Sequence, residues 1–163
     1  MTLTKRMRSS GLDRTTVALL LASLVLALLH HTDHVLRVDH SGWPFRSEVT
    51  DFTFSLLAYP MILFALLGPR RLFGLRMLLL VLGTAFTLYA HTAVESPVMQ
   101  FAMWAENRSL DPHAAGLHNA LDVRSPTLGG VAVVVSMALN VTAVAATGSM
   151  LWQYLRLRRN QAG

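Results

Sequence analysis

The chain contains no cysteine, and only 14% of its 163 residues are charged. The absence of cysteine excludes disulfides, thiolate metal sites, iron–sulfur clusters and cysteine nucleophiles. The charged fraction lies well below the roughly 25% of ordinary globular proteins, while hydrophobic residues make up 53% of the chain. Phosphate-loop and dinucleotide fingerprints and a hydrolase nucleophile elbow are also missing from the sequence. This composition disfavours the common soluble enzyme classes and indicates a membrane protein.

Four apolar stretches, counted with their flanking turns, each supply the roughly 20 residues that cross a ~30 Å hydrocarbon core. They predict membrane helices over residues 14–36, 50–67, 73–95 and 128–154. Pro60 lies inside the second stretch, where neighbouring helices satisfy the freed carbonyl of a proline kink. The first stretch follows a basic segment but lacks a small-residue cleavage site, so we expect an uncleaved anchor. The fold class predicted is an all-α integral membrane protein, with residues 1–163 forming one four-helix transmembrane bundle.

Two further short helices are predicted between the third and fourth membrane helices. Ser96-Pro97 and Asp111-Pro112 each combine a capping residue with a proline at the first helical position. We expect helices over residues 97–106 and 112–122, lying on or capping the outer ends of the bundle.

Basic residues are distributed unequally between the two sides of the predicted membrane domain. One side carries the termini and the second loop, with ten basic residues and one acid, and the other carries four basic residues and eight acids. By the positive-inside rule, the first side is cytoplasmic. The sequence therefore predicts a multi-pass protein of the inner (plasma) membrane, with both termini inside. Its Ala-, Leu- and Arg-rich composition is typical of bacteria, and the net charge of +5 indicates orientation in the bilayer rather than nucleic-acid binding.

All the histidines fall on the outer side of the predicted domain, with eight of the nine acids. They are His30, His31, His34, His40, His91, His113 and His118. Histidine and carboxylate side chains bind metals and transfer protons, so we interpret the outer side as the functional face.

The sequence HHTDHVLR places four of these polar side chains on one helix face. His30, Asp33, His34 and Arg37 share that face, whereas His31 points about 100° away from it. The i, i+4 spacing of His30 and His34 lets two imidazoles bind one metal ion. Asp33 is expected to orient an imidazole, and Arg37 to pair with a carboxylate or an anion.

Two further pairs with the same spacing are predicted to lie at the same level of the membrane. His91 and Glu95 end the third membrane helix, and His118 and Asp122 lie on the predicted helix 112–122. Asp51 begins the second membrane helix. We therefore expect a metal site with ligands His30, His34, His91 and Glu95, supplemented by Asp33, Arg37, Asp51, His118 or Asp122.

A nitrogen and oxygen ligand set without sulfur suits zinc, iron, manganese or copper(II). Such a metal could activate water or transform a lipid-soluble substrate, so the leading hypothesis is a membrane metalloprotein, and an enzyme is one form of it. A second hypothesis is a haem b protein that uses His30 or His34 with His91 as axial ligands. Two more hypotheses need no cofactor: a pH-responsive face, or an assembly subunit of a homo-oligomer or membrane complex. The same residues also fit plain helix-end polarity and interhelical hydrogen bonding.

Overall fold

The computed structural model describes residues 10–38, 51–112 and 115–162, and within these ranges it contains helices and no strand. This confirms the all-helical class. Three helices, Arg14–Arg37, Arg70–Val94 and Pro126–Asn160, are long and apolar enough to cross a membrane, and Phe52–Leu67 forms a shorter apolar segment.

Large apolar side chains cover the outside of the long helices. Val25 and Leu28 on the first helix, and Val134 and Val141 on the last, are each at least 58% exposed. A soluble monomer rarely presents so much contiguous apolar surface, whereas a lipid-facing surface requires it. Helix length and surface together indicate a membrane protein.

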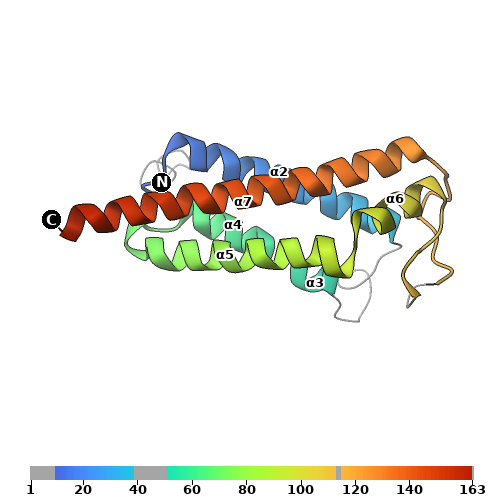
Figure 1. The fold of residues 1–163 in the computed structure, drawn as a ribbon, viewed down its shortest axis with the longest axis horizontal. Coiled ribbons are helices and arrows are strands. Elements are labelled where there is room, and N and C mark those ends of the chain that lie inside the picture. Colours follow the sequence, from blue (N-terminus) through green and yellow to red (C-terminus); the bar gives the residue numbers. More distant parts are fainter. Residues whose placement is uncertain (1–9, 39–50, 113–114, 163) are drawn as a thin grey trace.

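The long helices run side by side along the longest axis of the molecule (Figure 1). Helix α7 (Pro126–Ala162) packs against α2 (Arg14–Arg37) and α5 (Phe73–Tyr89), and α4 (Ala58–Leu67) packs against α5 and α2. The start of α2 and the end of α7 lie at one end of the molecule, and α6 (Pro97–Ala105) lies at the opposite end. The core between the helices comprises Leu20, Ile62, Ala65, Leu66, Phe73, Leu80, Ala146 and Met150.

The second predicted span is divided into two helices rather than one. Helix α3 (Asp51–Ser55) ends three residues before α4 begins at Ala58, with a turn over residues 56–57. Pro60 explains the position of the break, because the proline ring clashes with the carbonyl four residues earlier, that of Leu56. The break positions Ser55 and Tyr59 beside α2, where both contact His31.

Arg76 lies inside the molecule and not among the surface charges of the loop before α5. A short 3₁₀ helix, η1 (Arg70–Leu72), precedes α5. The Arg76 side chain is fully buried and donates to the carbonyl of Ala65 through Nε (3.0 Å) and Nη2 (2.5 Å), and to that of Ser10 through Nη1 (2.7 Å). The Ala65 carbonyl lies near the C-terminus of α4, where backbone carbonyls have no partner within their own helix.

The third predicted span changes its helical geometry near its C-terminal end. Helix α5 continues directly into η2 (Ala90–Val94), a π-helical turn that closes with a 2.8 Å hydrogen bond from the Glu95 N–H to the Ala90 carbonyl. A π turn is wider than an α turn and is frequent at functional sites. His91 lies within it, so the predicted i, i+4 relation between His91 and Glu95 does not hold as it would on an α-helix.

The segment after η2 confirms one predicted short helix and corrects the other. Ser96 caps α6 by accepting from the Met99 N–H (3.4 Å), with Pro97 at the first turn, as the sequence predicted. The predicted helix 112–122 was wrong, because residues 115–122 form turns and loop. Gly116 and Asp122 adopt positive φ angles of 85° and 49°, which no α-helix accommodates. His40 and His113 fall outside the described residues.

Candidate functional site

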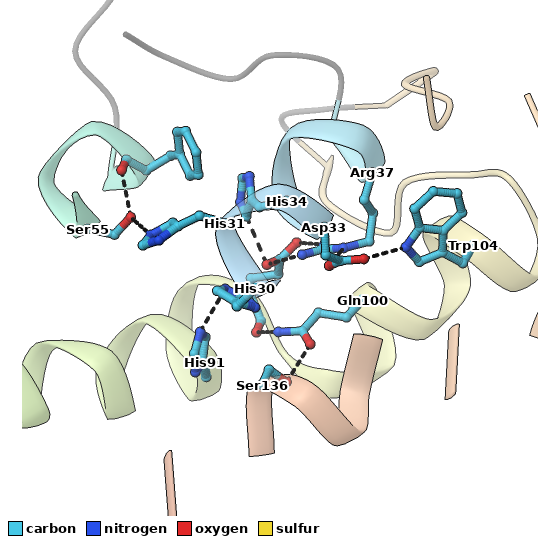
Figure 2. A network of polar contacts seen from close by, with 12 residues as sticks. His30, His31, Asp33, His34, Arg37, Ser55, His91, Gln100, Trp104 and Ser136 are labelled. Atoms are coloured by element: carbon cyan, nitrogen blue, oxygen red, sulfur yellow. Dashed lines mark hydrogen bonds and ion pairs between the residues drawn. The ribbon is translucent and has the colours of Figure 1, made fainter. Parts of the chain in front are cut away.

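Two histidines from different helices meet in the interior of the molecule (Figure 2). His30 on α2 and His91 on η2 are 6% and 4% exposed, and their Nε2 atoms lie 3.0 Å apart. Nδ1 of His91 lies 2.8 Å from Oδ1 of Asn140 on α7. Because the amide oxygen only accepts, Nδ1 of His91 carries the proton and its Nε2 presents a lone pair to His30. Three helices thus fix the tautomer and orientation of His91.

Arg37 lies at the centre of a charged cluster beside this histidine pair. Its side chain is 1% exposed, and its Nε donates to Oδ2 of Asp33 at 2.8 Å. Its two terminal nitrogens donate to the two carboxylate oxygens of Glu95, one of them at 3.1 Å. Trp104 on α6 donates from Nε1 to the other oxygen of Asp33 at 2.8 Å. One guanidinium therefore holds two carboxylates, and these three side chains carry a net charge of −1.

His34 lies between the charged cluster and the second apolar segment. Its Nε2 is 3.8 Å from Oε2 of Glu95, and its ring stacks on Phe52 with 4.4 Å between centroids. Its ring centroid is 6.2 Å from that of His30. The structure therefore brings together the four residues predicted as ligands, in two contacts: His30 with His91, and His34 with Glu95.

His31 has hydrogen-bond partners of its own. The sequence predicted that it would point away from the other histidines of α2. Its Nε2 lies 2.7 Å from Ser55 Oγ, and its Nδ1 lies 2.7 Å from the Tyr59 hydroxyl. Ser55 donates its own proton to the Phe52 carbonyl at 2.6 Å. The serine oxygen must then accept from His31, so Tyr59 donates to Nδ1. This chain ties α2 to α3 and α4.

A cavity of about 90 Å³ lies against the histidines. Its polar wall includes Ser23, His30 and His34, and each of these side chains has a buried polar atom without a hydrogen-bond partner: Oγ of Ser23 and Nδ1 of both histidines. Buried polar atoms are nearly always hydrogen-bonded, so unsatisfied atoms around one cavity point to a polar or charged occupant. A cavity of this volume accommodates a small ion or a few water molecules.

Of the remaining predicted residues, His118 and Asp122 do not join this cluster. Nδ1 of His118 donates to the backbone carbonyl of Asn107 (2.8 Å). The side-chain Nδ2 of Asn107 donates to Oδ1 of Asp122 (2.6 Å). Both contacts shape the loop that follows α6. The side chain of Asp51 lies outside the described part of the structure.

Sequence reasoning missed three residues that complete the polar network. Trp104 and Gln100 lie on α6, where the surrounding apolar residues suggested only contact with the membrane surface. Gln100 is fully buried, accepts from Ser136 on α7 (2.7 Å) and donates to the carbonyl of Glu95 (3.4 Å). Tyr59 gave no signal beyond its place before Pro60. A buried glutamine within an apolar helix is the one feature that could have predicted this contact.

Across the described residues, no group of three or more His, Asp or Glu side chains is arranged as a metal-binding set. Both oxygens of Glu95 instead accept hydrogen bonds from Arg37. The geometry offers two imidazole nitrogens that face each other and a third histidine, His34, on the same helix as His30 (Figure 2). Glu95 lies 3.8 Å from this third histidine.

Comparison of the chain with protein-family models, with curated proteins and with solved structures finds no match.

Proposed function

We propose that this protein binds a divalent transition metal ion between His30 and His91, inside a bundle of four membrane-crossing helices. The observation that carries the proposal is the 3.0 Å separation of the two Nε2 atoms. In a metal site, the bond from an imidazole nitrogen to the metal is about 2.0–2.1 Å long. Two imidazoles on one ion, at tetrahedral or octahedral angles, therefore have their nitrogens roughly 2.9–3.4 Å apart. The pair is thus spaced as two ligands of one ion would be.

Three surrounding features support a cation at this position. Asn140 holds Nδ1 of His91, which is the usual arrangement of a metal-ligating histidine. Oε2 of Glu95 lies 3.8 Å from Nε2 of His34, so negative charge is present beside the proposed third ligand. His34 lines the same cavity with an unpartnered Nδ1, and we propose it as the third ligand after a side-chain rotation. Glu95 then balances charge through Arg37 rather than binding the metal directly.

Zinc, iron, manganese and copper(II) all accept imidazole ligands, and the remaining coordination positions would be open to water or substrate. The cavity wall away from the histidines is apolar and includes Ile62, Leu80 and Leu139. A substrate that reached the metal through this part of the cavity would be lipid-soluble.

The haem b hypothesis has less support from this geometry. Axial histidines must lie on opposite faces of the macrocycle, whereas His30 and His91 are in hydrogen-bond contact beside a cavity of about 90 Å³. A cofactor-free role keeps one supporting observation, because the same 3.0 Å contact fits an N–H···N hydrogen bond between neutral imidazoles.

We also propose four membrane crossings with both termini in the cytoplasm. The start of α2 and the end of α7 lie at the same end of the molecule, which supports an even number of crossings (Figure 1). Arg70, Arg71 and the arginines at the end of α7 lie at that end too, in agreement with the positive-inside rule.

The test is metal analysis of the full chain, purified in detergent without chelator, in three forms: wild type, His30→Ala/His91→Ala and His118→Ala. We expect stoichiometric metal in the wild type and in His118→Ala, and its loss in the double variant. His118 serves as the matched control because its contacts lie in the loop after α6. Equal metal contents in the wild type and the double variant would overturn the proposal, and a haem absorption band in the wild type would favour the haem b hypothesis.

A further inference from the structure

A second pocket lies at the end of the molecule where α2 begins and α7 ends. It has a volume of about 580 Å³ and is formed between η1, the first turn of α5 and the last turns of α7. Its lining consists of Arg70, Arg71, Phe73, Gly74, Tyr154, Leu157 and Arg158. We call this set the arginine pocket.

The walls of the arginine pocket, as far as the structure describes the chain, carry three guanidinium groups and no carboxylate. Among the described residues, none of these three arginines forms an ion pair. Arg158 is held in place by Tyr154, since its Nε donates to the tyrosine hydroxyl (3.1 Å) and its guanidinium lies 5.5 Å from the ring centroid. Planar guanidinium groups bind phosphate oxygens in pairs, which makes an anion with several oxygens the matching ligand.

The lining of the arginine pocket also includes apolar and aromatic side chains. Phe73 and Tyr154 stack with their ring centroids 6.2 Å apart, and Leu157 lies beside them. Phe73 is buried in the main core, whereas the arginines around it are exposed. The site therefore combines a carbon-lined base with a cationic rim, at the level where the apolar parts of the helices end.

A phospholipid with an anionic headgroup has this same pairing of chemistries. Basic pockets between membrane helices on the cytoplasmic side bind acidic lipid headgroups, and the cytoplasmic leaflet is negatively charged. We infer that the arginine pocket binds the phosphate of an anionic phospholipid, with Arg70, Arg71 and Arg158 around the phosphate and the lipid glycerol and chains against Phe73 and Leu157. This inference is independent of the metal site.

The experiment reconstitutes the full chain in phosphatidylcholine vesicles with spin-labelled phosphatidylglycerol or spin-labelled phosphatidylcholine as the probe. The measured quantity is the motionally restricted fraction of each probe, which gives their relative association with the protein. We expect a several-fold preference of the wild type for phosphatidylglycerol. Arg70→Gln/Arg71→Gln/Arg158→Gln should reduce this preference to near that for phosphatidylcholine.

The matched control is Arg14→Gln/Arg156→Gln/Arg159→Gln, which removes three exposed charges from the same end but outside the pocket. We expect it to retain most of the preference. Arg158→Gln alone leaves η1 unchanged and should lose part of the preference, which guards against misfolding of the triple variant. Equal losses in the pocket and control triple variants, or no preference in the wild type, would overturn the inference. If inorganic phosphate alone displaced the spin-labelled phosphatidylglycerol, the inference of a lipid ligand would be overturned, and a free anion would be the ligand instead.

Discussion

At the residue scale, Arg37 connects three parts of the chain through its guanidinium group. Asp33 lies one turn away on α2, Glu95 follows η2, and Trp104 on α6 reaches the group through Asp33. Removing one member of a buried ion pair is strongly destabilising because the other member keeps its charge without a partner. The stability of the end of the molecule that contains α6 therefore depends on this one side chain.

Replacing Arg37 with glutamine should destabilise the protein by about 3 kcal/mol, at the low end of the range for a broken buried pair. We expect the low end because Asp33 and Glu95 retain 17% and 19% exposure. The matched control is Arg108→Gln. Arg108 and its partner Glu106 are 62% and 46% exposed, so their ion pair should contribute at most about 1 kcal/mol to stability. Unfolding in mixed detergent micelles measures both, and similar losses in the two variants would contradict the cluster's structural role.

Tyr59→Phe should destabilise the protein by about 1 kcal/mol, since it removes one neutral hydrogen bond and leaves Nδ1 of His31 unpaired. Tyr89→Phe is the control because Tyr89 is 57% exposed, and it should have little effect. Thermal unfolding of the two variants compares them directly. An unchanged midpoint for Tyr59→Phe would show that the hydrogen bond between Tyr59 and His31 contributes nothing to stability.

At the scale of elements, α6 is held against α7 by very close packing. A Cβ atom added at Gly129 would lie 2.9 Å from both the ring Cδ2 and the carbonyl oxygen of Phe101. The same atom at the neighbouring Gly130 would have no atom within 4 Å. Two adjacent glycines in one helix thus have opposite roles, the first permitting the contact and the second facing open space.

Gly129→Ala should destabilise the protein by about 1–3 kcal/mol, because the carbonyl of Phe101 cannot move without moving α6. Gly130→Ala should instead stabilise it by up to about 1 kcal/mol, since alanine favours the helix and meets no neighbour. The unfolding midpoints of the two variants test the packing. We expect a lower midpoint than that of the wild type for Gly129→Ala and a higher one for Gly130→Ala. A loss of stability in both variants would contradict it.

Some of these elements are encoded locally in the sequence, and some are not. Apolar length and the Ser96-Pro97 cap follow from local chemistry, and the structure confirms the helical class and α6. The helix predicted over 112–122 was wrong because side-chain contacts of Asn107 with Asn119 and Asp122 shape this segment as a loop, and the Asp111-Pro112 signal does not encode them. The π turn at residues 90–94 and the pairing of Arg37 with Glu95 depend on tertiary packing, which helical spacing does not encode.

At the scale of the whole molecule, the two ends differ in charge and in construction. The end with α6 contains the buried histidines and the half-buried Asp33 and Glu95, and the opposite end contains the arginine pocket. Such an asymmetry supports the proposed orientation, since basic flanking residues favour the cytoplasmic side of a membrane.

The absence of cysteine makes this orientation directly testable, because the wild type is unreactive toward maleimides. We expect Leu110→Cys to react with a membrane-impermeant maleimide on intact spheroplasts. Asn160→Cys, exposed at the end of α7, should react only after lysis. The reverse pattern would place the termini outside, and equal reaction of both before lysis would rule out a single orientation.

Helix α7 passes both sites without interruption, and this has a mechanical consequence. Asn140, which accepts from His91, and Tyr154, which holds Arg158, are separated by about 21 Å along one helix axis at 1.5 Å per residue. A hydrogen-bonded helix is axially stiff, so an axial displacement at Tyr154 moves Asn140 by nearly the same distance. Any load that displaces the end of α7 along its axis therefore also displaces Asn140, the hydrogen-bond partner of the His91 ring.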